Sequence, residues 1–346
     1  FEPSGRSVFV LPGTTVYECS ARAGLVLQSP CGGKGTCGKC RVRVRRGACE
    51  PTPSCRKLFT AAQLNEGMRL ACQARVTGDC VVEIPDESLF EKTGSQILTA
   101  TSGRPVEVKP AVWKRHLQLP EPCRGDDQPD LSRIETALGL RLRANLHVLR
   151  RLPTVLRASA FSVTAAICDD RLVGIEPGDT SGECYGVAFD LGTTTLVGVL
   201  IDLLSGHDRA LAAVLNPQIA SGDDVISRIL RAREEPGALE DMQKAVLDAL
   251  NGLIDQLLEQ SGVARERVYE VVVAGNTAMQ HLLCGISPDA LGEVPFPPAY
   301  KRGLFVYARD VGFRVHPNAT LYVFPNIGGF VGGDTVAGIL AATMHD

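Results

Sequence analysis

Several sequence features that would directly reveal the class of a protein are scarce or missing in this chain of 346 residues. No apolar run approaches the roughly 18 residues that a membrane-spanning helix needs, and the first residues show no charged-then-apolar signal pattern. The formal net charge is only −3, so the chain has no surplus of positive charge for nucleic acid. We therefore expect no membrane partner and no nucleic-acid partner, and a cytoplasmic location.

The chain also lacks the even cysteine spacing of a disulfide framework. Eight of its 12 cysteines lie before residue 81, and the other four are scattered over the rest. Clustered cysteines in a larger chain favour a local metal or redox site. The first residue is Phe1 rather than Met, and Asp346 ends an apolar, helix-like run. We therefore expect a fragment of a longer protein.

Length and composition predict a multidomain protein, because about 150 residues make a typical domain. Changes in composition divide the chain into 1–86, 87–110, 111–183 and 184–346. The first part is predicted to be a small α+β domain. The second is polar and irregular, as linkers are. The third is predicted to be a small α/β domain without a chemical motif, and the fourth a larger α/β domain.

Periodicity and turn residues predict individual elements. The segment 6–11 is predicted to be a strand, and it is followed by a Pro-Gly turn and a helix over 16–27. Alternating charged and apolar residues predict a strand over 41–45. The other predicted strands are 79–85, 161–167, 171–179, a hairpin over 187–202, 271–274 and 321–325, and the other predicted helices are 131–138, 223–233 and 238–260.

The most specific chemical signal is a glycine-rich cysteine loop. Cys31, Cys37 and Cys40 stand at C-x5-C-x2-C, and Cys72 follows in Leu-Ala-Cys-Gln. Plant-type [2Fe–2S] ferredoxins use C-x4-C-x2-C with a distant fourth cysteine. The pattern predicts one [2Fe–2S] cluster. A zinc site is the alternative, since C-x2-C pairs also bind zinc. Glycine allows the positive φ angles that aim backbone N–H groups at sulfur, and the loop has Gly32, Gly33, Gly35 and Gly38.

Three small-residue turns suggest phosphate binding. Asp190-Leu-Gly-Thr-Thr-Thr195 follows an apolar strand, and its carboxylate could hold Mg²⁺ through water while the turn offers N–H and hydroxyl groups to phosphate. Gly275-Asn-Thr277 ends another apolar strand, and Gly332-Gly-Asp334 precedes a helix, where backbone amides can meet an anion. Taken singly, each could be an ordinary turn. Their order along the chain is similar to that of the actin, sugar kinase and Hsp70 nucleotide fold.

The whole chain resembles the ATP-dependent reductive activators of corrinoid proteins, which join a [2Fe–2S] domain, a linker, a middle domain and an actin-like ATPase domain. The resemblance implies a β-grasp ferredoxin domain, a small α/β middle domain and an incomplete, ribonuclease H-like ATPase domain. It rests on the cysteine loop, Leu70–Gln73, Asp190–Thr195, Leu215–Arg228, Val273–Met279 and Asn326–Asp334.

This resemblance implies ATP-dependent one-electron reduction of an inactive Co(II) corrinoid protein to Co(I). The partners would be that corrinoid methyltransferase protein and an upstream electron donor, and a homodimer is one oligomeric state left open. The cofactors would be a [2Fe–2S] cluster, ATP and Mg²⁺. By motif match, Cys31, Cys37, Cys40 and Cys72 would hold the cluster, and Asp190, Gly192, Thr193, Thr194, Thr195, Gly275, Asn276, Thr277, Gly332, Gly333 and Asp334 would hold Mg²⁺ and nucleotide.

Two other functions remain open on the sequence alone. One is a ferredoxin-type electron carrier whose second half senses nucleotide or docks partners without turnover. The other is an iron–sulfur activator of radical dehydratases, although those normally hold a [4Fe–4S] cluster. The polar block 216–228 could serve the nucleotide, the corrinoid partner or simply a capped helix that starts at Gly222-Asp-Asp. We expect the chain, as a fragment, to hold its cluster and to hydrolyse ATP poorly.

Overall fold

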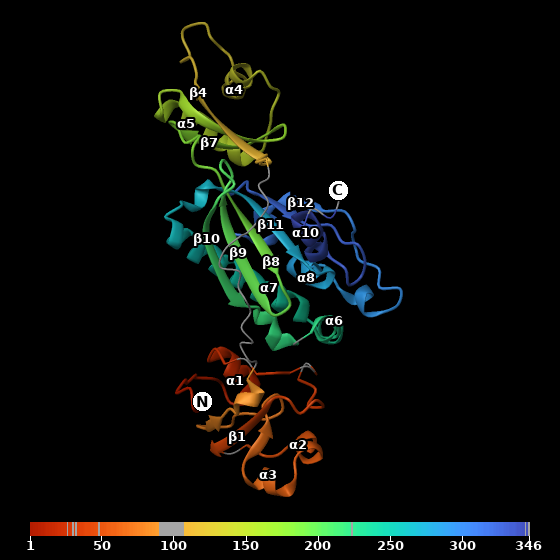
Figure 1. Ribbon diagram of the computed structural model, residues 1–346. Helices are drawn as coiled ribbons and strands as arrows, with labels where there is room; N and C mark the ends of the chain where they lie inside the picture. The colour runs from red at the N-terminus through yellow and green to blue at the C-terminus, as the bar shows by residue number, and fades with distance from the viewer. Residues whose placement is uncertain are drawn as a thin grey trace.

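The computed structural model describes residues 1–25, 27–29, 31, 33–47, 49–89, 107–222, 224–342 and 344. Most of the predicted linker 87–110, together with Gly32 and Asp223, lies outside these residues. Three sheets define three groups of residues, which we call the cysteine unit (1–89), the four-stranded unit (107–183) and the six-stranded unit (184–344). Figure 1 shows the cysteine unit and the four-stranded unit at opposite ends of the six-stranded unit. The protein is therefore a mixed α/β multidomain chain, as the sequence predicts.

The cysteine unit is built on a short antiparallel sheet in the order β2-β1-β3. The strands are β1 (Arg41–Arg46), β2 (Met68–Leu70) and β3 (Val81–Glu83). Its core contains Val42 of β1, Leu70 of β2 and Val82 of β3, all of which are buried. Around the sheet lie α1 (Val16–Arg22), α2 (Pro53–Leu58), α3 (Ala61–Asn65) and the 3₁₀ turn η1 (Asp86–Ser88).

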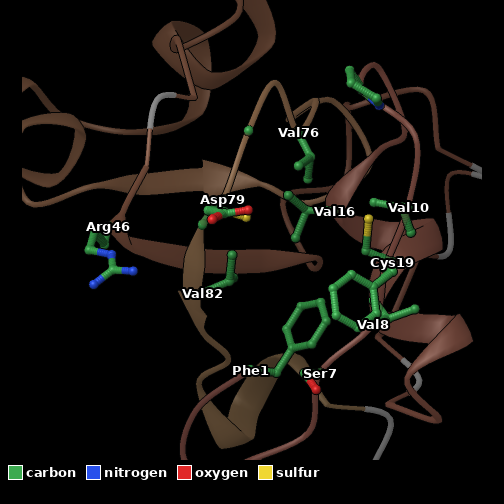
Figure 2. A pocket seen from close by; sticks show the side chains of 14 residues that line it. Phe1, Ser7, Val8, Val10, Val16, Cys19, Arg46, Val76, Asp79 and Val82 are labelled. Atoms are coloured by element: carbon green, nitrogen blue, oxygen red, sulfur yellow. The ribbon is translucent and has the colours of Figure 1, made fainter.

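The predicted strand at residues 6–11 is wrong, because these residues form no regular structure. Glu2 occupies the edge of β3 instead, since its N–H donates to Val82 and its carbonyl accepts from Ile84. The segment 6–11 therefore has no partner strand among the residues that the structure describes, and Phe9 and Leu11 are fully or largely exposed. Figure 2 shows Val8 and Val10 lining a pocket of about 430 Å³ beside the sheet. The predicted helix over 16–27 is confirmed only as far as Arg22, because Gly24 adopts a left-handed φ of 71°.

The four-stranded unit has the strand order β4-β6-β7-β5. The predicted helix and the two strands that follow it are confirmed as α4 (Asp130–Leu138), β6 (Ser162–Cys168) and β7 (Arg171–Pro177). Asp169 has a positive φ of 53° in the tight turn between the two strands. Three further elements were not predicted from the sequence: β4 (Val112–Gln118), β5 (Arg143–Ala144) and α5 (Leu146–Ala158).

The six-stranded unit contains the order β10-β9-β8-β11-β13-β12. Its first three strands pair antiparallel, whereas β8, β11 and β13 run parallel. These strands are β8 (Tyr185–Leu191), β9 (Thr195–Asp202), β10 (Asp208–Leu215), β11 (Val268–Gly275), β12 (Leu304–Tyr307) and β13 (Thr320–Val323). The predicted hairpin over 187–202 is confirmed by β8 and β9.

Helices cover this sheet and connect its strands. The longest, α7 (Ala238–Ser261), buries Leu250, Leu253 and Leu257 in the same core as the strands. This helix and α6 (Val225–Glu234) confirm the helices that periodicity predicts over 238–260 and 223–233. The others are α8 (Thr277–Leu283), α9 (Ala308–Val311), α10 (Gly333–Ala341) and the 3₁₀ turns η2 (Pro217–Ser221), η3 (Arg265–Arg267) and η4 (Asp289–Gly292).

Buried polar contacts join the four-stranded and six-stranded units. The Lys114 ammonium of β4 lies 2.7 Å from the Glu176 carboxylate of β7. Arg267, Tyr269 and Thr180 also contact that carboxylate. Lys114 and Glu176 are almost fully buried, so this cluster is shielded from water and links the two sheets. Among the helices described, none is long and apolar enough to cross a membrane.

Candidate functional site

The four predicted cysteine ligands lie together as two pairs. Cys31 and Cys37 approach to 3.3 Å between their sulfur atoms, and so do Cys40 and Cys72. The second pair is set by the sheet, because Cys40 precedes β1 and Cys72 follows β2. Pairing of Arg41 with Leu70 and a hydrogen bond of 2.8 Å from Ala71 N–H to the Cys40 carbonyl bring their backbones together.

The loop around the first pair needs glycine at particular positions. Gly33, Gly35 and Gly38 all have positive φ angles, which are costly for other residues. A Cβ on Gly35 would lie 2.9 Å from Gln73, next to the fourth cysteine. Gln73 Nε2 donates to the Gly33 carbonyl at 2.6 Å, so the loop is tied to the segment that carries Cys72. These contacts form a cradle in which the backbone can approach a bound group closely.

The surroundings of the thiols shift their pKa values in opposite directions within each pair, and the thiolate is the ligand form of cysteine. Burial raises the pKa of Cys31, but N–H groups of the backbone at Cys37, Thr36 and Gly35 outweigh it and bring the pKa to about 6. In the other pair, the hydrogen bond from Cys72 lowers the pKa of Cys40. Each pair thus holds one thiol with a lowered pKa, whereas burial raises the pKa of its partner Cys37 and the hydrogen bond to Cys40 raises the pKa of its partner Cys72.

The arrangement fits a two-iron cluster better than a zinc ion. Tetrahedral zinc needs four donors around a single point. Among the residues described, no three His, Cys, Asp or Glu side chains are placed to share one metal ion. Two irons held by four cysteines take two thiolates each. Two separate sulfur pairs therefore match the donor set of a [2Fe–2S] cluster.

The other cysteines of this unit do not join the cluster loop. Cys55 of α2 is fully buried, and its sulfur accepts the Leu70 N–H at 3.4 Å. Cys19 faces the pocket of Figure 2, on whose lining none of the four predicted ligands lies. We interpret these thiols as parts of the core, which is the ordinary place of a free cysteine.

The three predicted phosphate turns lie together in the six-stranded unit. The turn 192–194 joins β8 to β9, and Asn276 Nδ2 donates to Thr193 Oγ1 at 3.1 Å. Gly332 lies against the same segment, since a Cβ there would be 2.6 Å from the carbonyl carbon of Asn276. A Cβ on Gly192 would lie 2.5 Å from the Thr195 carbonyl oxygen. Gly332 is therefore required for its turn to approach Asn276, and Gly192 is required for the turn between β8 and β9 to close on itself.

The carboxylates of Asp190 and Asp334 lie near enough in these turns to interact electrostatically. Desolvation and then the negative charge of Asp334 raise the pKa of Asp190. A divalent cation between the two groups would remove that repulsion, and oxygen ligands with retained water suit Mg²⁺. Gly333 opens α10, which gives an anion the N-terminus of a nine-residue helix. Thr195 is the first residue of β9, Gly275 the last of β11 and Thr277 the first of α8.

Gln280 is a candidate site residue that was not predicted from the sequence. Its Nε2 is buried and has no hydrogen-bond partner among the described residues, while its Oε1 accepts from Tyr300 at 3.2 Å. A Cβ on Gly333 would clash with this Nε2. An unsatisfied donor under the glycine turn is costly unless an acceptor arrives. Nothing in the local sequence marked it, because the contact depends on the packing of α8 under α10.

Comparison with known proteins places these features in one family. Residues 1–77 match the 2Fe-2S iron-sulfur cluster binding domain, residues 101–182 the RACo linker region and residues 185–346 the RACo middle region. A shorter stretch is similar to a component of the Na(+)-translocating NADH-quinone reductase of Idiomarina loihiensis, with 38% identity over 82 residues, 24% of this chain and 20% of that one.

Fold and site together thus place the chain among the reductive activators of corrinoid proteins that carry a ferredoxin-type domain. The chain is a homologue of the corrinoid activation enzyme RamQ of Eubacterium limosum, with 30% identity over 328 residues, 94% of this chain and 52% of RamQ. It shares its fold with a solved reductive activator for a corrinoid, iron-sulfur protein, with TM-score 0.63, 33% identity, 99% of this chain and 57% of the other covered. The chain therefore spans about half the length of these relatives.

Proposed function

We propose that this chain delivers one electron through a [2Fe–2S] cluster to an inactive Co(II) corrinoid protein, giving Co(I), at the expense of ATP. The observation that carries the proposal is the presence, in one chain, of two thiol pairs and of three converging phosphate-type turns. Homology to RamQ supports the corrinoid protein as the acceptor. The electron would come from a separate donor protein. We propose the cytoplasm as the location, and the divisions 1–86, 87–110, 111–183 and 184–346 as the domains.

In this proposal Cys31, Cys37, Cys40 and Cys72 hold the cluster, which when bound supplies one-electron transfer. Asp190 and Asp334 orient Mg²⁺, and the glycine and threonine turns hold the phosphates in an actin-like ATPase domain. A nucleotide is needed because a plant-type cluster near −400 mV is a weak reductant for Co(II), and each 59 mV of adverse potential costs about 1.4 kcal/mol. The other proposed nucleotide contacts are Gly192, Thr193, Thr194, Thr195, Gly275, Asn276, Thr277, Gly332 and Gly333.

The test is a mixture of the anaerobically purified protein, a Co(II) corrinoid protein and a chemical reductant, with and without MgATP. We expect about two irons and two sulfides per chain, and a visible spectrum of Co(I) that forms only with MgATP and forms slowly, because we also propose that this fragment hydrolyses ATP poorly. Cys72→Ser should lose the cluster, and Asp190→Asn should retain it but reduce Co(II) at least about 10-fold more slowly, because a group that orients Mg²⁺ is removed.

Cys123→Ser is the matched control, because Cys123 is an exposed cysteine outside the cluster loop. It should leave both the iron content and the reduction rate unchanged. A zinc-loaded, colourless protein would overturn the cluster assignment. Equal Co(I) formation with and without MgATP would instead favour a simple electron carrier.

A further inference from the structure

Two polar residues, Asn216 and Arg228, bind the turn 192–194 between β8 and β9, which we call the phosphate turn. Asn216 Nδ2 donates to the Gly192 carbonyl at 2.8 Å, and Asn216 N–H donates to the Thr194 carbonyl at 2.8 Å. Arg228 Nη2 donates to the remaining carbonyl, that of Thr193, at 2.6 Å. All three residues between β8 and β9 are therefore anchored through their carbonyl groups, and this anchoring does not use the N–H groups of the two threonines.

The guanidinium of Arg228 also contacts the segment that precedes its own helix. Arg228 Nε donates to the Gly222 carbonyl at 2.9 Å, and Nη1 lies 3.4 Å from Gln218 Oε1. Arg228 is fully buried, so these bonds do not compete with water. The planar guanidinium of arginine can donate hydrogen bonds in two directions at once, which a lysine ammonium on its flexible side chain does less well. Arg228 thus ties the phosphate turn to η2 and the residue after it.

The same region also contacts the cysteine unit. Tyr17 of α1, which is largely buried, donates through its hydroxyl to the Ile219 carbonyl of η2 at 3.2 Å. Lys34, which lies between Cys31 and Cys37, forms an ion pair of 3.4 Å with Glu234 at the end of α6. One contact comes from the helix of the cysteine unit and the other from its cysteine loop. The two contacts therefore orient that loop relative to η2.

We propose that η2 and the end of α6 form the docking surface for the chain's own cysteine unit, and that Arg228 is the positioning residue that ties this surface to the phosphate turn. The proposal rests on the proposed nucleotide site and extends it, because it specifies how the two halves of the protein influence each other. Binding equilibria that share such an element are linked reciprocally. A nucleotide that orders the phosphate turn would favour docking of the cysteine unit, and docking of the cysteine unit would favour nucleotide binding.

Docking is tested first without nucleotide, by hydrogen exchange of the backbone amides in η2. Lys34→Glu places a negative charge opposite Glu234, and we expect about 2- to 10-fold faster exchange at residues 218–222. Lys39→Glu is the matched control, because Lys39 is an exposed lysine of the same loop and Glu234 pairs with Lys34 instead. It should leave exchange in η2 unchanged. Equal exchange in the wild type and in Lys34→Glu would overturn the docking surface.

The link to the turn is tested by the dissociation constant of MgATP. Tyr17→Phe removes one hydroxyl and keeps the ring, and we expect about 2- to 10-fold weaker binding, the loss typical of one hydrogen bond. Arg228→Lys keeps the charge but not the fork, and it should weaken binding as well. In the double variant the combined loss should be smaller than the product of the two, because both act through η2.

The outcomes separate this inference from the proposed function. If wild-type protein binds no MgATP while Lys34→Glu still speeds exchange in η2, the nucleotide proposal fails and the docking surface stands. If wild type binds MgATP and Arg228→Lys binds it equally well, positioning by Arg228 is overturned. Melting temperature and visible absorbance of the cluster are recorded for each variant, so that a variant that fails to fold is recognised.

Discussion

At the scale of single residues, His316 illustrates how the interface between the two larger units constrains a titratable group. Its ring packs against that of Tyr269 in a tilted arrangement, with 4.4 Å between centroids, and Nδ1 accepts the Asn318 N–H at 3.1 Å. Burial lowers the pKa of His316 to about 3, with Glu176 opposing the shift and Arg151, His147 and Lys114 adding to it. The folded protein therefore keeps this imidazole neutral where an unfolded chain protonates it.

This shift predicts a loss of stability in mild acid. The unfolded state binds the extra proton below about pH 6.5, so the free energy of unfolding falls as the pH drops from 6.5 towards 3. At pH 5 the loss from this group is about 2 kcal/mol, taking about 1.4 kcal/mol per unit of pH. Urea titrations at pH 7 and pH 5 measure it, and His316→Asn should lose correspondingly less over the same interval. Identical losses in both proteins would contradict the assignment.

At the scale of elements, the close approach of Gly332 to the segment at Asn276 matters most. A Cβ there meets backbone atoms, which cannot rotate away. We expect Gly332→Ala to cost about 1 to 3 kcal/mol of stability and to weaken MgATP binding, because α10 is displaced from the turns. Gly338→Ala is the control within the same helix, since a Cβ at that position meets nothing within 4 Å. It should stabilise the protein by up to about 1 kcal/mol. Thermal unfolding of both variants measures these changes in stability, and equal melting temperatures would contradict the prediction.

Elements also show how far the sequence alone could be used. The hairpin of β8 and β9, the long helix α7 and the strands β6 and β7 were predictable because each carries its own periodicity and turn residues. The strand over 6–11 failed for a tertiary reason, since a strand needs a partner edge and Glu2 occupies the edge of β3. The four paired cysteines could be singled out by their spacing. Arg228 and Gln280 could not be assigned a role, because their contacts depend on how distant helices pack.

At the scale of the whole molecule, Glu176 holds the four-stranded and six-stranded units together. Its carboxylate accepts from Lys114, whose side chain is fully buried, and it contacts Arg267 and Tyr269. Burial raises the pKa of Glu176, but hydrogen bonds from Lys114, Thr180 and Tyr269 outweigh it and lower the pKa overall. The stabilisation is therefore present above the usual glutamate pKa and is lost as the pH falls from there through the lowered pKa of the folded state.

Removing the negative charge of Glu176 should weaken the contact between the four-stranded and six-stranded units, so that they unfold at different urea concentrations. Glu176→Gln leaves the buried Lys114 ammonium without its counter-charge and removes one of the two carboxylates that pair with Arg267, and we expect a cost of about 3 to 5 kcal/mol. Glu183→Gln is the control, because its side chain pairs with the same Arg267 at 2.8 Å but is 53% exposed, so the cost should stay below about 1 kcal/mol. Fluorescence of Trp113, which lies on β4, follows unfolding of the four-stranded unit in urea. Equal midpoints for the two variants would show that the cluster is not what joins the units.

The strand β8 has a mechanical consequence. It begins at Tyr185, directly after Cys184, which packs against Val112 of the four-stranded unit, and it ends at Leu191, where the phosphate turn starts. Seven residues at about 3.3 Å each make a rod of roughly 23 Å. The strand is hydrogen-bonded to β9 on one side and to β11 on the other, which restrains its movement. A displacement of the four-stranded unit would therefore be transmitted along β8 to the phosphate turn, where we propose that ATP binds.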